Sequence, residues 1–346
     1  MQAVVYYERA EKAIEIRDVP VPKIGPDECL VRVKYCGICG SELHMYHGQL
    51  NVLARPPVIL GHEWTGEIVA MGERVTRFAG GDRVVSETAA ETCGVCVYCR
   101  SGEYNLCPER RAFGFGVDGA FTSYVRVRHT LLHHIPGEVS YEAATMAEPI
   151  CVAYNAVVDK SRLHPGDIVV VIGPGPVGLF ALQMARLAGA GTIVVTGTKR
   201  DRKRLDLAAE LGADLVVDVG EQNPLDVVRR LGDGQGAHLV IDAAGVPPAI
   251  EQSLELVRRN GWITKIGWSL QPVNLTLDEI VAKAITYQGS FSHTWKTWET
   301  CLDLLRRGRI ATEPLLTGIW PITCWHEAFE KLEALEAHKI LLSPVD

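Results

Sequence analysis

The sequence predicts an α/β protein in which a doubly wound parallel sheet is joined to a separate β-rich unit. The 346 residues are enough for two domains. Short β-branched runs between Gly, Pro and Asp turns fill residues 1–150. Strand and helix patterns then alternate through residues 151–290. We expect residues 1–150 to form one domain together with the returning segment 291–346, and residues 151–290 to form the other.

Composition narrows the class of protein. The net charge of −7 argues against a nucleic-acid partner, because such proteins usually carry a basic surplus. The N-terminal residues contain acids and no apolar core segment, which excludes a signal peptide and makes the cytoplasm the expected location. Residues 168–185 are uncharged, but the Gly and Pro residues at their centre indicate a strand, a turn and a helix rather than a membrane span.

The β-rich unit is predicted from β-branched runs bounded by turn residues such as Gly80-Gly81-Asp82. The expected strands are Ala3–Tyr7, Leu30–Tyr35, Thr65–Met71, Arg83–Glu87 and Ser123–Val127. Short strands separated by such turns indicate a barrel-like or sandwich domain.

In the second half of the chain, strand patterns alternate with helix patterns. This alternation implies βαβ units with helices on both faces of a parallel sheet. The expected strands are 168–172, 192–196, 214–218, 238–243 and 262–267, and the expected helices are 176–188, 201–211, 223–231 and 247–259. An apolar strand pattern at Ile285–Phe291 is compatible with pairing across a subunit interface or with an ordinary covered strand. The tail is predicted to form one helix, 325–334, and one strand, 339–342.

A glycine-rich turn follows the first of these strands, with the spacing G-x-G-x-x-G. Gly173 suits a tight turn out of the strand, Gly175 lets a pyrophosphate approach the backbone, and Gly178 allows close helix–sheet packing. Pro176 and Val177 begin the helix, whose N-terminus attracts anions. The stretch therefore predicts a dinucleotide-binding loop.

Four of the ten cysteines fall within fifteen residues. The spacing is Cys93-x2-Cys96-x2-Cys99-x7-Cys107, on a segment that also holds Gly94 and Gly102. Four thiolates can close a tetrahedral zinc site and leave no position open for water, so the set predicts a structural zinc. The spacing does not fit a zinc ribbon, in which two Cys-x2-Cys pairs lie well apart.

A second group of possible metal ligands is spread along the chain and includes thiol, imidazole and carboxylate side chains. Residues 37–44 hold a thiol, a hydroxyl and an imidazole, Gly61-His62-Glu63 follows about twenty residues later, and Glu148-Pro149 lies near the end of the β-rich unit. A thiolate, an imidazole and a carboxylate would leave one zinc position open, which is the mark of a catalytic zinc.

In these motifs the chain resembles the medium-chain, zinc-dependent alcohol dehydrogenases, in particular their polyol (sorbitol or L-iditol) and threonine dehydrogenase branch. The resemblance rests on G-I-C-G-S-E-L-H at 37–44, G-H-E at 61–63, the four cysteines, A-E-P at 147–149 and G-P-G-P-V-G at 173–178. It implies a GroES-like catalytic domain, a Rossmann domain and a homodimer or homotetramer. It also implies that a secondary alcohol, such as a polyol or sugar alcohol, is reversibly oxidised to a ketone with hydride transfer to NAD(P).

The resemblance assigns roles to individual residues. It makes Cys39, His62 and Glu63 ligands of the catalytic zinc, with Glu148 beside the metal as a ligand either directly or through water. Ser41 and His44 match the proton-relay positions. Glu42 departs from the family, which usually has Asp there, so the surroundings of the metal could shift. With the four-cysteine set, the expectation is two zinc ions per chain.

The cofactor is expected to be NADP, with NAD as the alternative. In an NAD site an acid at the end of the second strand binds the ribose 2′-hydroxyl, but here Thr192–Thr196 is followed by Gly197 and then by a hydroxyl and several cations. The expected 2′-phosphate contacts are Thr198, Lys199, Arg200 and Arg204. The alternative is that these cations form a solvated helix start with Asp201 as its N-cap.

Two other functions remain open at this point. One is a non-catalytic, zinc-stabilised nucleotide-binding protein, which would not need Cys39, His62 and Glu63. The other is a dehydrogenase for an amino alcohol such as threonine, since the substrate-contacting side chains carry no motif.

Overall fold

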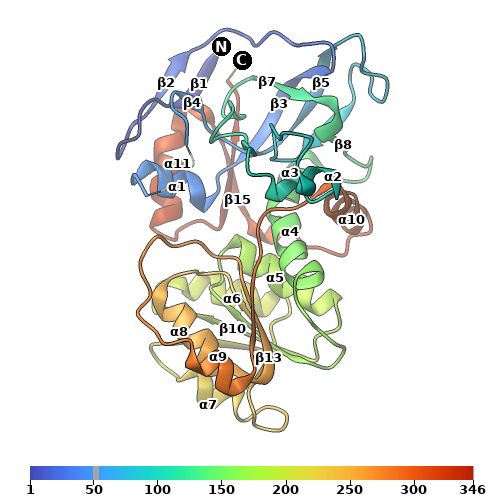
Figure 1. Cartoon of the computed structure of the whole chain (residues 1–346). Coiled ribbons are helices and arrows are strands. Elements are labelled where there is room, and N and C mark those ends of the chain that lie inside the picture. Colours follow the sequence, from blue (N-terminus) through green and yellow to red (C-terminus); the bar gives the residue numbers. More distant parts are fainter. Residues whose placement is uncertain (50–53, 346) are drawn as a thin grey trace. The chain divides into compact units, whose positions relative to one another are not determined.

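The computed structural model describes residues 1–49 and 54–345. Packing divides the chain into two compact units. Unit 1 comprises Met1–Glu148, His293–Gly308 and the residues from Thr312 onward, and unit 2 comprises Pro149–Ser292 and Arg309–Ala311. Figure 1 shows that the red C-terminal elements α11 and β15 belong to the same lobe as the blue N-terminal strands.

Unit 1 is built around a seven-stranded, mainly antiparallel sheet of order β15-β16-β3-β5-β6-β8, in which β7 also pairs with β3. A smaller sheet has the order β2-β1-β4. Together the two sheets of unit 1 contain the strands β1 (Gln2–Tyr6), β2 (Ile14–Asp18), β3 (Glu28–Gly37), β4 (Val58–Ile59), β5 (Glu63–Met71), β6 (Arg83–Ser86), β7 (Tyr124–Arg128), β8 (Leu132–His134), β15 (Leu316–Pro321) and β16 (Lys339–Ser343). On β3, Cys29, Val31 and Val33 alternate toward the core, as a half-buried strand requires.

Unit 1 also contains several helices. They are α1 (Gly40–Tyr46), α2 (Val97–Arg100), α3 (Tyr141–Thr145), α10 (Trp295–Arg306) and α11 (Trp325–Glu333), and α4 (Ala147–Tyr154) begins at the end of the first segment of unit 1. The core of unit 1 includes Trp64, Phe113, Phe121 and Phe329.

Unit 2 is a six-stranded, fully parallel sheet of order β11-β10-β9-β12-β13-β14. Its elements are β9 (Ile168–Ile172), α5 (Pro176–Leu187), β10 (Thr192–Gly197), α6 (Arg202–Glu210), β11 (Leu215–Asp218), α7 (Pro224–Val228), β12 (Ala237–Asp242), α8 (Pro247–Leu256), β13 (Val257–Lys265), α9 (Asp278–Lys283) and β14 (Thr286–Gly289). Every residue of β9 is buried, which explains its continuous apolar run. The strand order reverses beside β9, the position at which such sheets bind ligands. The predicted fold class is confirmed.

Some predicted boundaries are wrong. The helix expected over 247–259 ends at Leu256, because Val257 already pairs with Ala237 on β12. The tail contains a second strand, β15, and it follows a helix, α10, that was not predicted. The structure places no helix long and apolar enough to cross a membrane within its described residues.

Candidate metal centres and nucleotide loop

The first donor set begins where β3 ends. Gly37 closes the strand and Cys39 is the N-cap residue of α1, with extended backbone angles. Glu42 lies one turn into α1, and its Oε2 accepts the backbone N–H of Cys39 at 2.9 Å. This bond satisfies one of the free donors at the helix start and fixes the backbone that carries the Cys39 thiol.

The same carboxylate also orients His62. Glu42 Oε1 lies 2.7 Å from His62 Nδ1, and both side chains are buried. Because a carboxylate accepts, Nδ1 carries the hydrogen and Nε2 is left for a metal. Burial would lower the pKa of His62, but the charges and hydrogen bonds of Glu42 and Cys39 together outweigh burial and raise it well above its usual value. Gly61, at a φ of +95°, makes the turn that places His62 before β5.

Glu63 forms a buried ion pair with Lys339, the first residue of β16. Lys339 Nζ also donates to the carbonyl oxygen of Ile38 at 2.9 Å. Burial would lower the pKa of Lys339, but Glu63, Cys39 and Glu42 together outweigh burial and raise it. Gly37 pairs with Glu63 across β3 and β5, and a Cβ at Gly37 would overlap the Glu63 carboxylate.

These side chains fit a metal ion. The donor atoms of Cys39, His62 and Glu63 all lie within 4.8 Å of one another. Glu63 Oε1 is buried without a hydrogen-bond partner in the described part of the chain. An unpartnered carboxylate oxygen beside a thiol and an imidazole nitrogen is what a cation with mixed ligands requires.

Glu148 is buried near this set but does not belong to the group within 4.8 Å. Burial would raise its pKa, but the hydrogen bond from His293 and the charges of His62 and Lys339 outweigh burial and lower it. Whether it ligates the metal directly or through water stays a prediction.

The expected relay residues lie on α1 but do not bond to each other. Ser41 Oγ is buried and has no hydrogen-bond partner among the described residues. His44 Nδ1 lies 2.5 Å from Gln49 Oε1. Ser41 therefore has a free donor and acceptor for a bound molecule.

The second donor set is the four-cysteine loop, residues 93–107. Its four sulfur atoms lie within 4.8 Å of one another. Backbone N–H groups of Val95 and Cys96 lower the pKa of Cys93 to about 7, whereas burial raises the pKa of Cys99 to about 12. Four thiolates so close together need a cation to balance their charge, and the all-sulfur set fits zinc.

The glycine loop leads from β9 into α5. Gly173 has a φ of +94°, and a Cβ there would lie 2.9 Å from that of Ala244. A Cβ on Gly178 would overlap the carbonyl oxygen of Gly173. Gly175, the N-cap residue of α5, faces open space, and Pro176 and Val177 form the first turn. The open side at the start of a twelve-residue helix suits a pyrophosphate.

The segment after β10 carries no free carboxylate at the strand end. Gly197 is the last residue of β10. Asp201 Oδ2 accepts from the backbone N–H and the hydroxyl of Thr198, at 3.0 and 2.8 Å. Lys199 and Arg200 are exposed, and Arg204 is largely buried 4.0 Å from Asp201.

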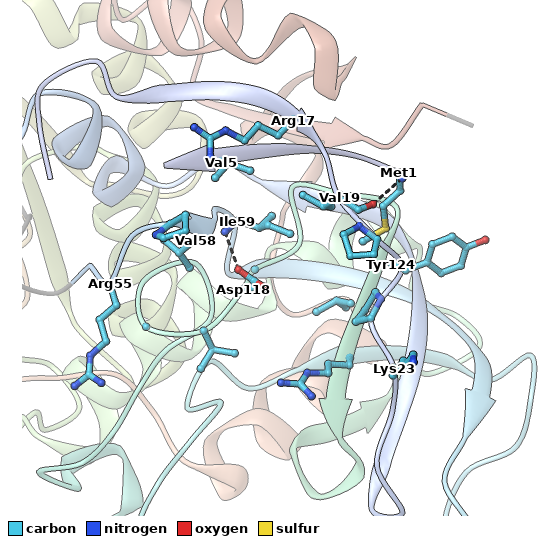
Figure 2. A pocket seen from close by; sticks show the side chains of 18 of the residues that line it. Met1, Val5, Arg17, Val19, Lys23, Arg55, Val58, Ile59, Asp118 and Tyr124 are labelled. Atoms are coloured by element: carbon cyan, nitrogen blue, oxygen red, sulfur yellow. Dashed lines mark hydrogen bonds between the residues drawn. The ribbon is translucent and has the colours of Figure 1, made fainter. Parts of the chain in front are cut away.

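A cavity of about 710 Å³ lies elsewhere in unit 1, beside β1 and β4 (Figure 2). Asp118 accepts the backbone N–H of Ile59 at 3.0 Å, and the amino group of Met1 donates to the carbonyl oxygen of Val19 at 2.9 Å (Figure 2). None of the metal-donor side chains lines this cavity.

Comparison with known proteins finds family models that match both halves of the chain. The family model of the alcohol dehydrogenase GroES-like domain matches residues 25–137, and that of the zinc-binding dehydrogenase domain matches residues 176–307. The chain is 40% identical to sorbitol dehydrogenase of Halalkalibacterium halodurans, with 100% of each chain covered. It is 38% identical to D-arabitol-phosphate dehydrogenase of Enterococcus avium, over 94% of this chain and 92% of the relative.

A solved structure shares the fold at a TM-score of 0.90 and 30% identity, with 99% of each chain covered. It is a protein from Sinorhizobium meliloti 1021, assigned as a zinc-binding dehydrogenase and bound to NADP. The chain therefore belongs to the zinc-dependent, medium-chain alcohol dehydrogenase family. It is an NAD(P)-dependent alcohol dehydrogenase.

Sequence reasoning missed two side chains of the first site. Lys339 contacts Glu63 from the far end of the chain, and His293 contacts Glu148. Neither belongs to a motif, and the one available signal for Lys339 is a charge at the start of an apolar strand.

We expect Glu42→Gln to weaken zinc binding at the Cys39 site by about 10- to 100-fold, because an amide cannot accept both hydrogen bonds. Glu42→Asp keeps the carboxylate and should retain most of the affinity. Competition with a chromophoric zinc chelator measures both variants. Wild-type affinity in Glu42→Gln would show that the carboxylate does not orient the ligands.

Proposed function

We propose that this protein reversibly oxidises a secondary hydroxyl of a polyol or sugar alcohol to a ketone, passing the hydride to a nicotinamide dinucleotide. The observation that carries the proposal is the three-donor set of Cys39, His62 and Glu63, which leaves a metal position for substrate. The polyol class is supported by the names of the two relatives at 40% and 38% identity.

The proposal includes two zinc ions per chain. Cys39, His62 and Glu63 would hold the first, with Glu148 beside it, and Cys93, Cys96, Cys99 and Cys107 would hold the second. When bound, the first zinc supplies Lewis acidity that makes a substrate hydroxyl more acidic. Ser41 Oγ, which has no partner among the described residues, would accept the hydroxyl proton as it gives up its own. Because Ser41 and His44 do not bond to each other, a bound molecule would have to link Oγ to the His44 ring before that proton reaches solvent. A nicotinamide dinucleotide held at the glycine loop would supply the hydride acceptor.

The residues around the donors keep this set in one arrangement. Glu42 holds His62 with Nε2 free and holds the backbone of Cys39. Lys339 balances part of the negative charge that a thiolate and a carboxylate bring into a buried site.

We also propose that NADP is the preferred cofactor. Support comes from the segment after β10, where Asp201 is engaged by Thr198 and no other carboxylate ends the strand. Arg200 can bind a 2′-phosphate bidentately and Lys199 can bind it as a point charge. The related structure bound to NADP agrees with this choice.

Arg200→Ala is expected to lower the catalytic efficiency with NADP by about tenfold, or roughly 1.4 kcal/mol, and to leave NAD use nearly unchanged. The measurement is kcat/KM with each cofactor. Arg202→Ala is the matched control, because Arg202 is exposed and pairs with Asp206 on its own helix. Equal losses with both cofactors, or a tenfold preference of the wild type for NAD, would contradict the proposal.

A panel of alcohols tests the substrate class. We expect the absorbance of the reduced nicotinamide to rise with at least one polyol or sugar alcohol and to stay flat with L-threonine. Turnover of threonine without turnover of any polyol would reverse the choice. A chain that binds NADP and both zinc ions but oxidises no alcohol would instead be the non-catalytic alternative.

The proposal extends to a cytoplasmic homodimer or homotetramer. Within the described residues β14 lies at one edge of the parallel sheet, where its backbone groups are available for pairing. Oligomeric state and location stay predictions.

A further inference from the structure

Behind Glu148 lies a chain of buried aromatic and polar side chains that the proposed reaction does not use. His293 Nε2 lies 3.1 Å from Glu148 Oε1, and the two residues are 2% and 7% exposed. Glu148 lies on α4, whereas His293 lies two residues before α10, so nothing local in the sequence brings them together. A buried carboxylate requires such a partner.

The tautomer of His293 is fixed by its other neighbour. Trp298 Nε1 donates to His293 Nδ1 at 2.7 Å, with the two rings edge to face at 5.1 Å. An indole N–H can only donate, so Nδ1 must be free of hydrogen. The single ring hydrogen is then on Nε2, which donates it to Glu148.

Trp298 contacts a second histidine besides His293. It is fully buried, and the ring of His133 stacks on it at 5.6 Å with an interplanar angle of 12°. His133 Nδ1 lies 2.6 Å from Glu299 Oε1 on the same helix as Trp298. Neither ring can turn without breaking a contact, so the indole N–H has a fixed direction.

The start of α10 is tied to the four-cysteine loop. The hydroxyl of Tyr104, which lies between Cys99 and Cys107, accepts the backbone N–H of Trp295 at 2.5 Å. The same hydroxyl donates to Glu87 Oε2 at 2.6 Å. The helix that carries Trp298 is therefore anchored at its first residue.

We propose that His293 is a positioning residue, which holds Glu148 through Nε2–H so that one carboxylate oxygen is engaged and the other remains for the metal centre. The proposal rests on the proposed zinc site for its purpose. The hydrogen-bond arrangement can be tested without zinc or turnover.

The first test is the ¹⁵N spectrum of the histidine rings in the metal-free full chain, with His293 assigned by the signals lost in His293→Gln. We expect Nδ1 without hydrogen and Nε2 with hydrogen. In Trp298→Phe, which keeps a ring against His133 but removes the donor, Nε2 should keep its hydrogen because Glu148 still accepts it, and the Nδ1 signal should move to that of a nitrogen without a hydrogen-bond partner. The opposite tautomer in the wild type, or loss of the Nε2 hydrogen in Trp298→Phe, would overturn the proposal.

The second test compares His293→Phe with His293→Gln, whose terminal amide can still donate near the position of Nε2. Zinc affinity at the Cys39 site is measured by chelator competition, and kcat and KM are measured in the loaded enzyme. We expect His293→Phe to weaken zinc about 10- to 100-fold and to lower kcat more than KM changes, and His293→Gln to recover most of both. NADP affinity should be unchanged in both variants.

The outcomes separate the alternatives. Equal loss in both variants would mean that His293 only fills space, and wild-type affinity in both would mean that Glu148 needs no anchor. If the wild type oxidised no alcohol, the proposed function would fail while the ring spectrum and zinc affinities still tested the role of His293. If His293→Phe did not fold, Trp298→Phe would carry the test.

Discussion

Replacing Cys39 by alanine is expected to lower alcohol turnover by roughly 10³-fold or more, because the change removes one of three metal donors. The fold should survive. Cys39 is only half-buried, and the bond that caps α1 runs from its backbone N–H to Glu42, which alanine retains. The loss should therefore be chemical rather than structural.

The measurements are kcat/KM, zinc content and the melting temperature. We expect the wild type to hold two zinc ions per chain and Cys39→Ala to hold one, at nearly the same melting temperature. Cys324→Ala is the control, because Cys324 is a half-buried thiol outside both donor sets. Normal turnover in Cys39→Ala would show that Cys39 is not needed at the catalytic site. A single zinc ion in fully active wild type would contradict the proposal of two zinc sites.

Features that depend on neighbouring residues could be predicted from the sequence. The turn from β9 into α5 needs glycines at fixed spacing, so the nucleotide loop is visible as a local pattern. The same is true of the four-cysteine loop, whose sulfur atoms come together within fifteen residues. The motif at 37–44 indicated Cys39, and the structure shows that Glu42 bonds to both Cys39 and His62.

Features that depend on tertiary contacts could not be predicted. Lys339 reaches Glu63 because β16 pairs with β3, a contact about 300 residues apart along the chain. His293 meets Glu148 through the packing of the segment before α10. The helix itself has a regular amphipathic pattern, with Trp298, Cys301 and Leu305 buried on one face, but nothing in that pattern pairs His293 with Glu148. The helix predicted to run to residue 259 ends at Leu256 as α8. Val257 already pairs with Ala237 of β12, and this tertiary contact, which no local pattern shows, begins β13 there.

Cys99→Ala is expected to disorder the four-cysteine loop and to release one zinc per chain. The first part of the loop packs against little else: no residue of α2 is buried, and Val95 and Val97 are 76% and 71% exposed, whereas Tyr104 and the buried Cys107 anchor its end. If the four thiols hold the proposed zinc, the order of this part comes mainly from that cation, so losing one ligand should cost on the order of 4 kcal/mol. Limited proteolysis, zinc content and thermal unfolding measure this effect.

The main core of unit 1 should remain, because it takes no residue from 91–112 within the described part of the chain. Early cleavage is therefore expected near residues 93–107 rather than throughout the unit. Ser101→Ala, which removes an exposed hydroxyl from the same loop, is the control and should change little. Since Tyr104 joins this loop to the first residue of α10, Cys99→Ala should also expose α10 to amide hydrogen exchange. A variant that keeps two zinc ions and resists protease like the wild type would show that the loop is held by packing alone.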